Sequence, residues 1–424
     1  MGIKYIFKRL MAEWKANMWL AVELLIVSVV IWIIVDQLYV QTKRVSEDRG
    51  FDISNTFLVD ISTLNSGAVE YKEESANDSA YSFDRMEMVE RLRRRPEVEC
   101  VGLSVNAYPY CGSNSGTGLR YINENGDTLL PSDGWILLRS VDPGFIKVFG
   151  YRGANGESPE HLAEILEKNP NSIMLSSNVF GDKTPDITGK EVEKYEGDYV
   201  PKKVSAIITP VKYTEYFSSR NSLSVVCPMG TDQFGNPGWY NEVTVRVKDG
   251  MAKDFIENLM ADSESQFRVG NQYIANVVSF DRLAKGFTLE NKQATRNKYI
   301  VMSFLLVNIF LGLLGTFWFR TRQRFSEIAL MKVAGATARS VFATQLGEGL
   351  LLLLLVTPVA AVIDINMAVM ELNAYGDTGY LEWPRMIACI ATVFAIMAVM
   401  IVCGVLLPAR KAMHVDPAEA LHDE

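Results

Sequence analysis

Four long apolar runs constrain this chain more than any other feature of its sequence. They are Trp19–Val35, Tyr299–Phe319, Val341–Ile363 and Met386–Leu407. A helix needs about 20 apolar residues to cross the hydrocarbon core of a bilayer. The last three runs reach that length, and the first does so when it is extended to Val40. Buried helices of globular proteins rarely run so far without a polar face. We therefore predict four membrane spans at 18–40, 299–319, 341–363 and 386–407.

The first apolar run is expected to remain in the protein as a membrane anchor. Asp36-Gln37-Leu38-Tyr39 follows the first run, and no small-x-small cleavage site is present, so the run is not a removable signal peptide. Residues 1–17 carry apolar side chains on one side of a short helix. Such a helix either lies in the lipid interface or simply extends the first span into the cytoplasm. Glu23, early in this span, either faces protein or reaches outward to the headgroups, and its shallow position favours the second.

The distribution of basic residues predicts the orientation in the membrane. Lys and Arg collect in cytoplasmic flanks of membrane proteins. Here they collect in the N-terminal tail, in the loop 320–340 and at the start of the tail 408–424, whereas the loop 364–385 is acidic except for Arg385. Both termini and the loop 320–340 are thus predicted to be cytoplasmic. The long segment 41–298 is predicted to be outside.

The outer segment reads as two strand–helix–strand units placed at its two ends. Alternating and helical patterns predict them at Asn55–Ser62, Asp84–Arg95 and Cys100–Ala107, and again at Glu242–Lys248, Lys253–Ser263 and Tyr273–Phe280. Two such units suggest one subdomain of 41–107 and 241–285, split by an inserted subdomain of 108–240. The insert contains short strand-like runs between Pro, Gly and Asn turns, and a short helix near Ala163–Lys168.

The predicted fold class is therefore a four-span α-helical membrane domain with an α+β extracytoplasmic domain. That outer domain combines a split βαβ-type subdomain with an inserted, mainly β subdomain. The polar segment 287–298 is compatible with a helix that continues into the second span. Such a helix would carry movement between the membrane and the outer domain.

The sequence contains no motif that indicates catalysis or the binding of a metal ion or cofactor. It contains three histidines and no metal-binding or nucleophile motif, and Gly181-Asp182-Lys183-Thr184 lacks the earlier glycine of a phosphate loop. The net charge of −8 argues against a nucleic-acid partner. Five cysteines do not form a disulfide framework, although a Cys100–Cys111 bridge stays open. We expect no catalytic residue, no metal site and no bound cofactor.

The segment Arg320–Glu348 is the part of the chain on which a partner can act. Its Ser326–Ala334 stretch has helical periodicity, Gly335 suits a helix C-cap, and Thr337 can cap a new helix that begins at Ala338. A short helix along the membrane, a tight turn and a re-entry are thus predicted. Glu348 lies further on in the third span, within reach of cytoplasmic basic residues.

Two motifs in the last third of the chain resemble a known family. The run from Ser326 to Ala336, SEIALMKVAGA, is followed by Arg339 and by Gln345-x-x-Glu348. It resembles the loop after the second span in MacB/FtsX-type ABC transporter permeases. The C-terminal PARKA and DPAEAL sequences look like the C-terminal signature of that family, and the order of spans is similar too.

The resemblance implies a permease driven by mechanotransmission. A cytoplasmic ABC ATPase would bind ATP and Mg and pass its movement through the spans to the outer domain. We expect the ATPase to be a separate chain, and the permease to form a homodimer or to pair with a related permease. The residues expected to contact the ATPase are Glu327, Ile328, Met331, Lys332, Gly335 and Arg339, with Glu348 as an intramembrane polar residue.

Three functions fit this resemblance. The first is efflux or extraction of a substrate from the periplasm by a permease of the bacterial inner membrane, with a periplasmic adaptor and an outer-membrane channel. The second is an FtsX-like, non-transporting regulator of a cell-wall hydrolase or a stress signal. The third is lipoprotein release. The size of the outer segment favours the first over the second.

Overall fold

The computed structural model divides into two compact units. The membrane domain comprises Met1–Lys43 and Gln293–Glu424, and the α+β domain comprises Arg44–Lys292. The two units confirm the predicted fold class. The residues that the structure describes are 3–12, 14–75, 78–112, 114–131, 135–181, 186–230, 234, 241–323, 335, 337–373 and 381–413.

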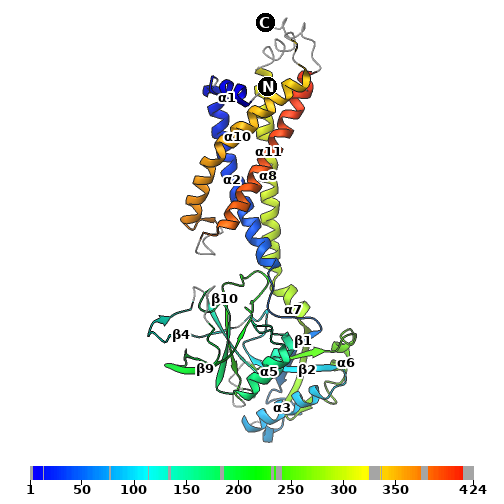
Figure 1. Cartoon of the computed structure of the whole chain (residues 1–424). Helices are drawn as coiled ribbons and strands as arrows, with labels where there is room; N and C mark the ends of the chain where they lie inside the picture. The colour runs from blue at the N-terminus through cyan, green and yellow to red at the C-terminus, as the bar shows by residue number, and fades with distance from the viewer. Residues whose placement is uncertain are drawn as a thin grey trace. The chain divides into compact units, whose positions relative to one another are not determined.

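Long helices make up the described part of the membrane domain (Figure 1). Four of the described helices are long and apolar enough to cross a membrane, as predicted. They contain the segments Asn17–Ser46, Leu289–Thr316, Arg339–Val369 and Trp383–Leu406. The full helices are α1 (Ile3–Ala12), α2 (Trp14–Ser46), α8 (Leu289–Gln323), α10 (Ala338–Val369) and α11 (Trp383–Met413).

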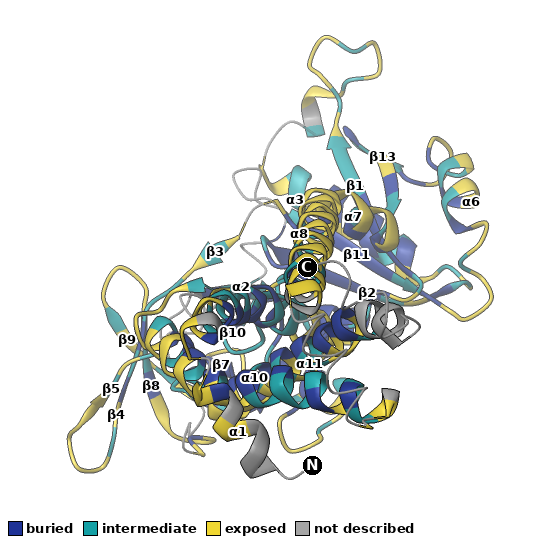
Figure 2. Cartoon of the chain, turned by 90° about the horizontal axis from the view of Figure 1, so that it is seen from above, coloured by how far each residue is buried: buried dark blue, intermediate teal, exposed yellow. Residues whose placement is uncertain are grey.

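Apolar side chains from α2, α10 and α11 form the core of the membrane domain. Leu24 and Trp32 of α2 are fully buried together with Leu353 of α10 and Met397 of α11. Helix α8 contributes little to this core, and its ribbon is mostly exposed in Figure 2. Much of the surface of α8 is thus left for lipid or for another protein.

The described part of the α+β domain is built on one mixed sheet of 13 strands. The strand order is β12-β13-β1-β11-β2-β6-β10-β7-β9-β8-β4-β5, with β3 paired to β6. β10 pairs with β6 and β7 pairs with β9 in parallel, and the other pairs are antiparallel. The strands are β1 (Thr56–Thr63), β2 (Val98–Val105), β3 (Ser115–Gly116), β4 (Leu119–Ile122), β5 (Thr128–Leu129), β6 (Trp135–Val141), β7 (Ser172–Ser176), β8 (Glu191–Tyr195), β9 (Tyr199–Ile208), β10 (Ser222–Pro228), β11 (Asn241–Val247), β12 (Arg268–Val269) and β13 (Gln272–Ser279).

The strand order shows how the two ends of the outer segment meet. β12, β13, β1, β11 and β2 come from the two ends and lie next to one another, so the two strand–helix–strand units share one half of the sheet. The strands of the middle segment form the other half. The halves join where β2 pairs with β6 over Ser104–Val105 and Ser140–Val141.

Short helices cover this sheet. The helix predicted at Asp84–Arg95 begins earlier, and the helices expected near 163–168 and 253–263 are present. A further short helix, α4, was not predicted. The helices are η1 (Glu73–Ser75), α3 (Asp78–Arg93), α4 (Pro143–Phe149), α5 (Pro159–Lys168), α6 (Phe255–Ala261) and α7 (Phe280–Phe287).

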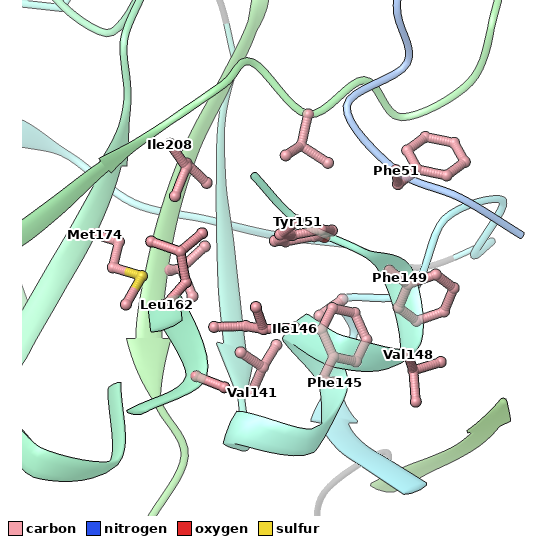
Figure 3. Packing of buried hydrophobic residues seen from close by; sticks show 14 of the residues in the cluster. Phe51, Val141, Phe145, Ile146, Val148, Phe149, Tyr151, Leu162, Met174 and Ile208 are labelled. Carbon is pink, nitrogen blue, oxygen red and sulfur yellow. The ribbon is translucent and has the colours of Figure 1, made fainter. Parts of the chain in front are cut away.

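Helix α4 supplies four apolar side chains to the central core. Phe145, Ile146, Val148 and Phe149 are all fully buried, and Figure 3 shows them packed beside Tyr151. Asp142 caps the helix by accepting a hydrogen bond from the backbone N–H of Phe145 at 2.8 Å. The core therefore rests on a helix of only seven residues.

The predicted continuity into the second span is found from Leu289 onward. Helix α8 runs without a break from Leu289 to Gln323. Thr288 separates it from α7, with φ −91° and ψ 1°, and its hydroxyl donates to the carbonyl oxygen of Ala284 at 2.6 Å. The connection is thus a continuous helix whose upstream end is marked by one capped turn.

Candidate functional site: the turn before α10 and the buried charges of the membrane domain

The turn before α10 has the local structure that its sequence predicts. Gly335 has φ +90°, a left-handed conformation that favours glycine. Thr337 is the N-cap of α10 with φ −74° and ψ 153°, and its side chain accepts a hydrogen bond from the backbone N–H of Ser340 at 3.3 Å. Arg339 lies exposed in the first turn of the helix. The predicted cap at Thr337 and the helix start at Ala338 are both confirmed.

The structure describes only part of the predicted ATPase contact. Glu327, Ile328, Met331 and Lys332 lie outside the described residues. Gly335 and Arg339 lie within them, close together along the chain. Glu348 is half-buried in α10 and belongs to the membrane domain. The assignment of these residues to an ATPase contact stays a prediction.

The most buried ion pair among the described residues joins α2 to α11. The guanidinium of Arg385 donates from Nε to Oδ1 and from Nη2 to Oδ2 of Asp36, both at 2.7 Å. Neither side chain is more than 1 % exposed. Bidentate geometry of this kind is what compensates for the loss of water around two buried charges.

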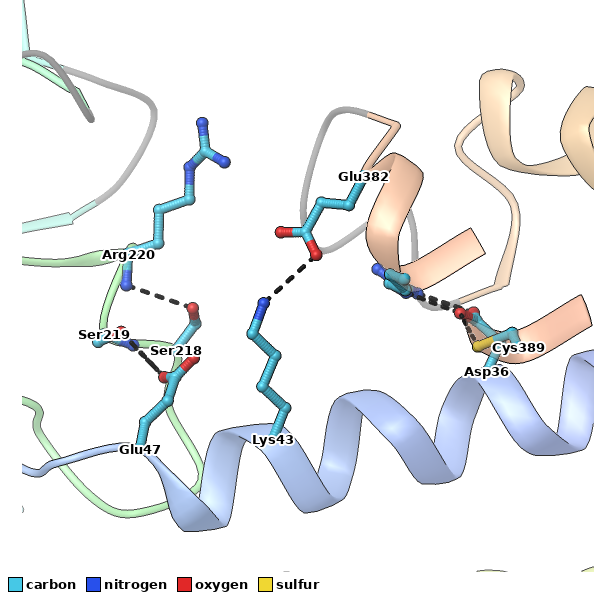
Figure 4. A network of polar contacts seen from close by, with 9 residues as sticks. Asp36, Lys43, Glu47, Ser218, Ser219, Arg220, Glu382 and Cys389 are labelled. Atoms are coloured by element: carbon cyan, nitrogen blue, oxygen red, sulfur yellow. Dashed lines mark hydrogen bonds and ion pairs between the residues drawn. The ribbon is translucent and has the colours of Figure 1, made fainter. Parts of the chain in front are cut away.

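An amide and a thiol complete the surroundings of Asp36. Asn373 donates from Nδ2 to Oδ2 of Asp36 at 2.8 Å, and its own Oδ1 accepts from Nε2 of Gln37 at 2.7 Å. The Cys389 thiol lies 3.9 Å from Oδ1 of Asp36, as drawn in Figure 4. Asn373 has φ +60°, a conformation that asparagine tolerates better than most residues. The polar contacts hold this strained residue in place.

Sequence reasoning did not find this cluster, although both of its charges were visible. In the sequence, Asp36 is the residue that ends the first apolar run. Arg385 is the one base of an acidic loop. A lone acid at one span end and a lone base at another are a signal for pairing, because an isolated charge inside a membrane is costly. The pairing itself depends on which helices pack together.

The expectation that Glu23 reaches outward to the headgroups is wrong. Its Oε1 accepts a hydrogen bond from the Thr316 hydroxyl at 3.0 Å, so the side chain points toward α8. Burying a carboxylate in the bundle is acceptable when a neighbouring helix supplies a donor. This contact is an attachment of α8 to α2.

Within the α+β domain, a buried lysine holds the segment that follows α2. The Lys212 side chain is fully buried, donates to the carbonyl oxygen of Arg44 at 2.7 Å and pairs with Glu47 at 3.2 Å. Glu47 also accepts from the Ser219 hydroxyl at 2.9 Å and from its backbone N–H at 3.1 Å (Figure 4). The loop between β9 and β10 thus holds the end of α2 in place.

The electrostatics of this contact follow from its geometry. Burial lowers the pKa of Lys212, and the nearby Glu47 carboxylate opposes the shift. Burial alone would raise the pKa of Glu47, but the Ser219 hydrogen bonds and Lys212 outweigh it, so the pKa of Glu47 is lowered. The pair is therefore held in its charged form.

The cysteines of the α+β domain are structural. Cys100, Cys111 and Cys227 form no disulfide, so no Cys100–Cys111 bridge is present. Burial raises the pKa of Cys100 and of Cys227 to about 11 in each case. Thiols with such a pKa carry almost no thiolate at neutral pH and are poor nucleophiles.

Solved structures of other proteins align with parts of this chain at low sequence identity. No curated protein is similar enough in sequence to count as a relative. The periplasmic region of MacB from Actinobacillus actinomycetemcomitans aligns with 59 % of this chain and 98 % of its own, at 13 % identity and a TM-score of 0.31. The extracellular domain of the noncanonic ABC-type transporter YknZ from Gram-positive bacteria aligns with 49 % of this chain and 89 % of its own, at 15 % identity and a TM-score of 0.28.

The family model that matches the chain covers its last three spans. Residues 299–417 match the model described as the FtsX-like permease C-terminal domain. This range contains α10, α11 and the turn that precedes α10, together with the SEIALMKVAGA and PARKA sequences that resembled the family. The chain is a multi-pass membrane protein whose residues 299–417 match the FtsX-like permease C-terminal domain.

Proposed function

We propose that this chain is the permease subunit of an ABC transporter that a separate cytoplasmic ATPase drives. The match of residues 299–417 to the FtsX-like permease C-terminal domain carries this proposal. The ATPase would bind ATP and Mg, and the permease would bind neither. Two copies of this chain, or this chain and a related permease, would bind two ATPase subunits.

The contact with the ATPase is proposed at residues 320–340. The turn at Gly335 and the exposed Arg339 support it, because a left-handed turn followed at once by a capped helix presents a defined surface. Glu327, Ile328, Met331 and Lys332 would complete that surface. A push on the turn would be transmitted along α10, which is continuous from Ala338 to Val369.

The route to the α+β domain is proposed along α2 and α8. Both helices extend into the residues of that domain, α2 as far as Ser46 and α8 from Leu289. The contact of Lys212 with Arg44 and Glu47 would pass movement of α2 into the sheet domain. The work done there would be extraction of a substrate from the bacterial periplasm, with an adaptor and an outer-membrane channel.

Labelling of introduced cysteines in intact cells tests the orientation on which this function depends. In a variant without the five native cysteines, Arg322→Cys and Asn125→Cys would each be treated with a membrane-impermeant maleimide. Both residues are exposed, one at the end of α8 and the other in the α+β domain. Asn125→Cys should react once the outer membrane is opened, and Arg322→Cys only after the inner membrane is lysed. Reaction of Arg322→Cys in cells with an intact inner membrane would refute the proposal.

A further inference from the structure

A second buried acid lies beside the Asp36–Arg385 pair. Asp364 belongs to α10 and is only 2 % exposed. Its Oδ1 is buried and has no hydrogen-bond partner among the described residues. The negative charge of Asp36 acts on it. A carboxylate at Asp364 would need a nearby base, but the charge that acts on it is that of another acid, Asp36.

The charges at this place do not balance. Arg385 donates one hydrogen bond to each oxygen of Asp36, and Asn373 donates a third to the same carboxylate. Among the described residues, Arg385 is the buried base beside Asp36, and its bonds to that acid are not shared with Asp364. An unpaired carboxylate inside a membrane domain is strongly disfavoured, and of two acids that share a site one keeps its proton.

We propose that Asp364 is a proton-binding site of the membrane domain. Among the described residues, the titratable groups that interact with it electrostatically are Asp36 on α2 and Cys389 on α11, and Arg385 on α11 binds Asp36. Arg385 neutralises Asp36, and the Cys389 thiol is a neutral donor to that same acid. The neutral carboxyl group of Asp364 is the form that this environment accepts.

The ligand is a proton and not a metal ion. In the part of the chain that the structure describes, no group of three or more His, Cys, Asp or Glu side chains is placed to hold a metal ion. Asp36 has its oxygens occupied by Arg385 and Asn373, so it has little to offer a cation. A carboxyl group with no neighbouring oxygen ligands binds a proton best.

The site makes the arrangement of the membrane helices dependent on pH. Asp364 lies on α10 and Asp36 on α2, so a movement that separates these helices would expose Asp364 to water and release its proton. The conformation described here would take the proton up again when the helices return. This inference needs no ATPase and is independent of the proposed function.

Infrared spectroscopy of the full-length protein in lipid nanodiscs tests the site directly. A protonated carboxyl group has a carbonyl stretch that a carboxylate lacks, and ¹³C-labelled aspartate shifts it. At pH 7 the wild type should show such a band, Asp364→Asn should lose it, and Asp281→Asn should retain it, because Asp281 is exposed on α7. A spectrum of Asp364→Asn that keeps every protonated-aspartate band of the wild type would overturn the proposal.

Thermal melting separates the two acids. Asp364→Asn should melt at or above the wild-type temperature, because the amide replaces a group that is already neutral. Asp36→Asn should melt lower, because it leaves the Arg385 charge buried and unpaired. An equal loss in both variants would contradict a neutral Asp364. Stabilisation of the wild type by sodium at fixed pH, absent in Asp364→Asn, would show that a cation and not a proton is bound.

Discussion

Two ion pairs of the described residues each contain a fully buried charge. Asp36 and Arg385 bind each other with two hydrogen bonds inside the membrane domain. Lys212 and Glu47 lie in the α+β domain, where the lysine also holds a backbone carbonyl group at the end of α2. Removing one member of such a pair leaves the other without compensation, which costs far more than the pair contributes.

Lys212→Met and Glu47→Gln should each destabilise the α+β domain. Lys212 is fully buried and Glu47 largely so, and loss of either partner should cost about 3 kcal/mol. The double variant should be less destabilised than the sum of the two, because no unpaired charge remains. Thermal melting of the full-length proteins in detergent measures all three.

Lys168→Met is the matched control for this prediction. Its pair with Glu164 is mostly exposed on α5, so its loss should change stability by no more than about 0.5 kcal/mol. If Lys212→Met behaved like Lys168→Met, the contact would not hold the end of α2.

The same pair predicts how stability changes in acid. The folded protein lowers the pKa of Glu47, so the stability that this group contributes is fully present above its ordinary pKa of 4.5. It is lost as the pH falls through the lower pKa of the folded state. The melting temperatures of wild type and Glu47→Gln should therefore converge in acid. A gap that stays constant down to pH 3 would argue against a charged Glu47.

At the scale of elements, close backbone contact explains why α4 sits where it does. A Cβ atom on Gly102 of β2 would lie 2.5 Å from Cα of Phe145, and one on Gly144 would lie 2.0 Å from the carbonyl oxygen of Val101. Two glycines, one on each element, allow the helix to lie directly on the strand. The buried aromatic rings of α4 then fill the centre of the core (Figure 3).

Gly102→Ala should therefore separate α4 from the sheet. The added methyl group meets backbone and cannot be relieved by a side-chain rotation, so we expect a loss of about 1–3 kcal/mol in unfolding free energy. Gly67→Ala is the control, because Gly67 has nothing but the Asn65 side chain within 4 Å, at 3.9 Å. Denaturant unfolding of both full-length variants checks the difference, and equal stabilities would contradict the close packing.

The elements differ in how well the sequence predicts them. β1, β11 and β13 follow a clear alternation, and each was located to within one or two residues. Helix α4 was missed because its apolar residues are nearly continuous and show no polar face. Its flanks carried the signal, since Asp142-Pro143 suits a helix start and Gly150 adopts the left-handed conformation after its end. The pairing of Asp36 with Arg385 could not be predicted, because it depends on how α2 packs against α11.

For the whole molecule, the account rests on the turn that begins α10. Gly335 has a left-handed backbone, and no atom of the described residues lies within 4 Å of an added Cβ, so the requirement that the described residues show is conformational. Gly335→Val should cost about 1–2 kcal/mol locally and distort the surface offered to an ATPase. We expect transport to fall by roughly tenfold or more while membrane insertion stays normal.

Gly335→Asn separates conformation from the mere loss of glycine. Asparagine adopts the left-handed region more readily than valine does, so this variant should retain most of the activity that Gly335→Val loses. Transport measured in membranes at matched protein levels makes the comparison. Equal activity of the two variants would mean that the turn does not shape the contact.

Site-specific photocross-linking in living cells tests the central claim most directly. One benzoylphenylalanine would replace Arg339, which is exposed in the first turn of α10. Another would replace Trp383, which is exposed at the start of α11. We expect the cross-linker at Arg339 to capture a nucleotide-binding subunit, which mass spectrometry would identify. The yield should change when ATP is depleted. The cross-linker at Trp383 should not capture that subunit. Capture of such a subunit from Trp383, or its absence from Arg339, would contradict the account.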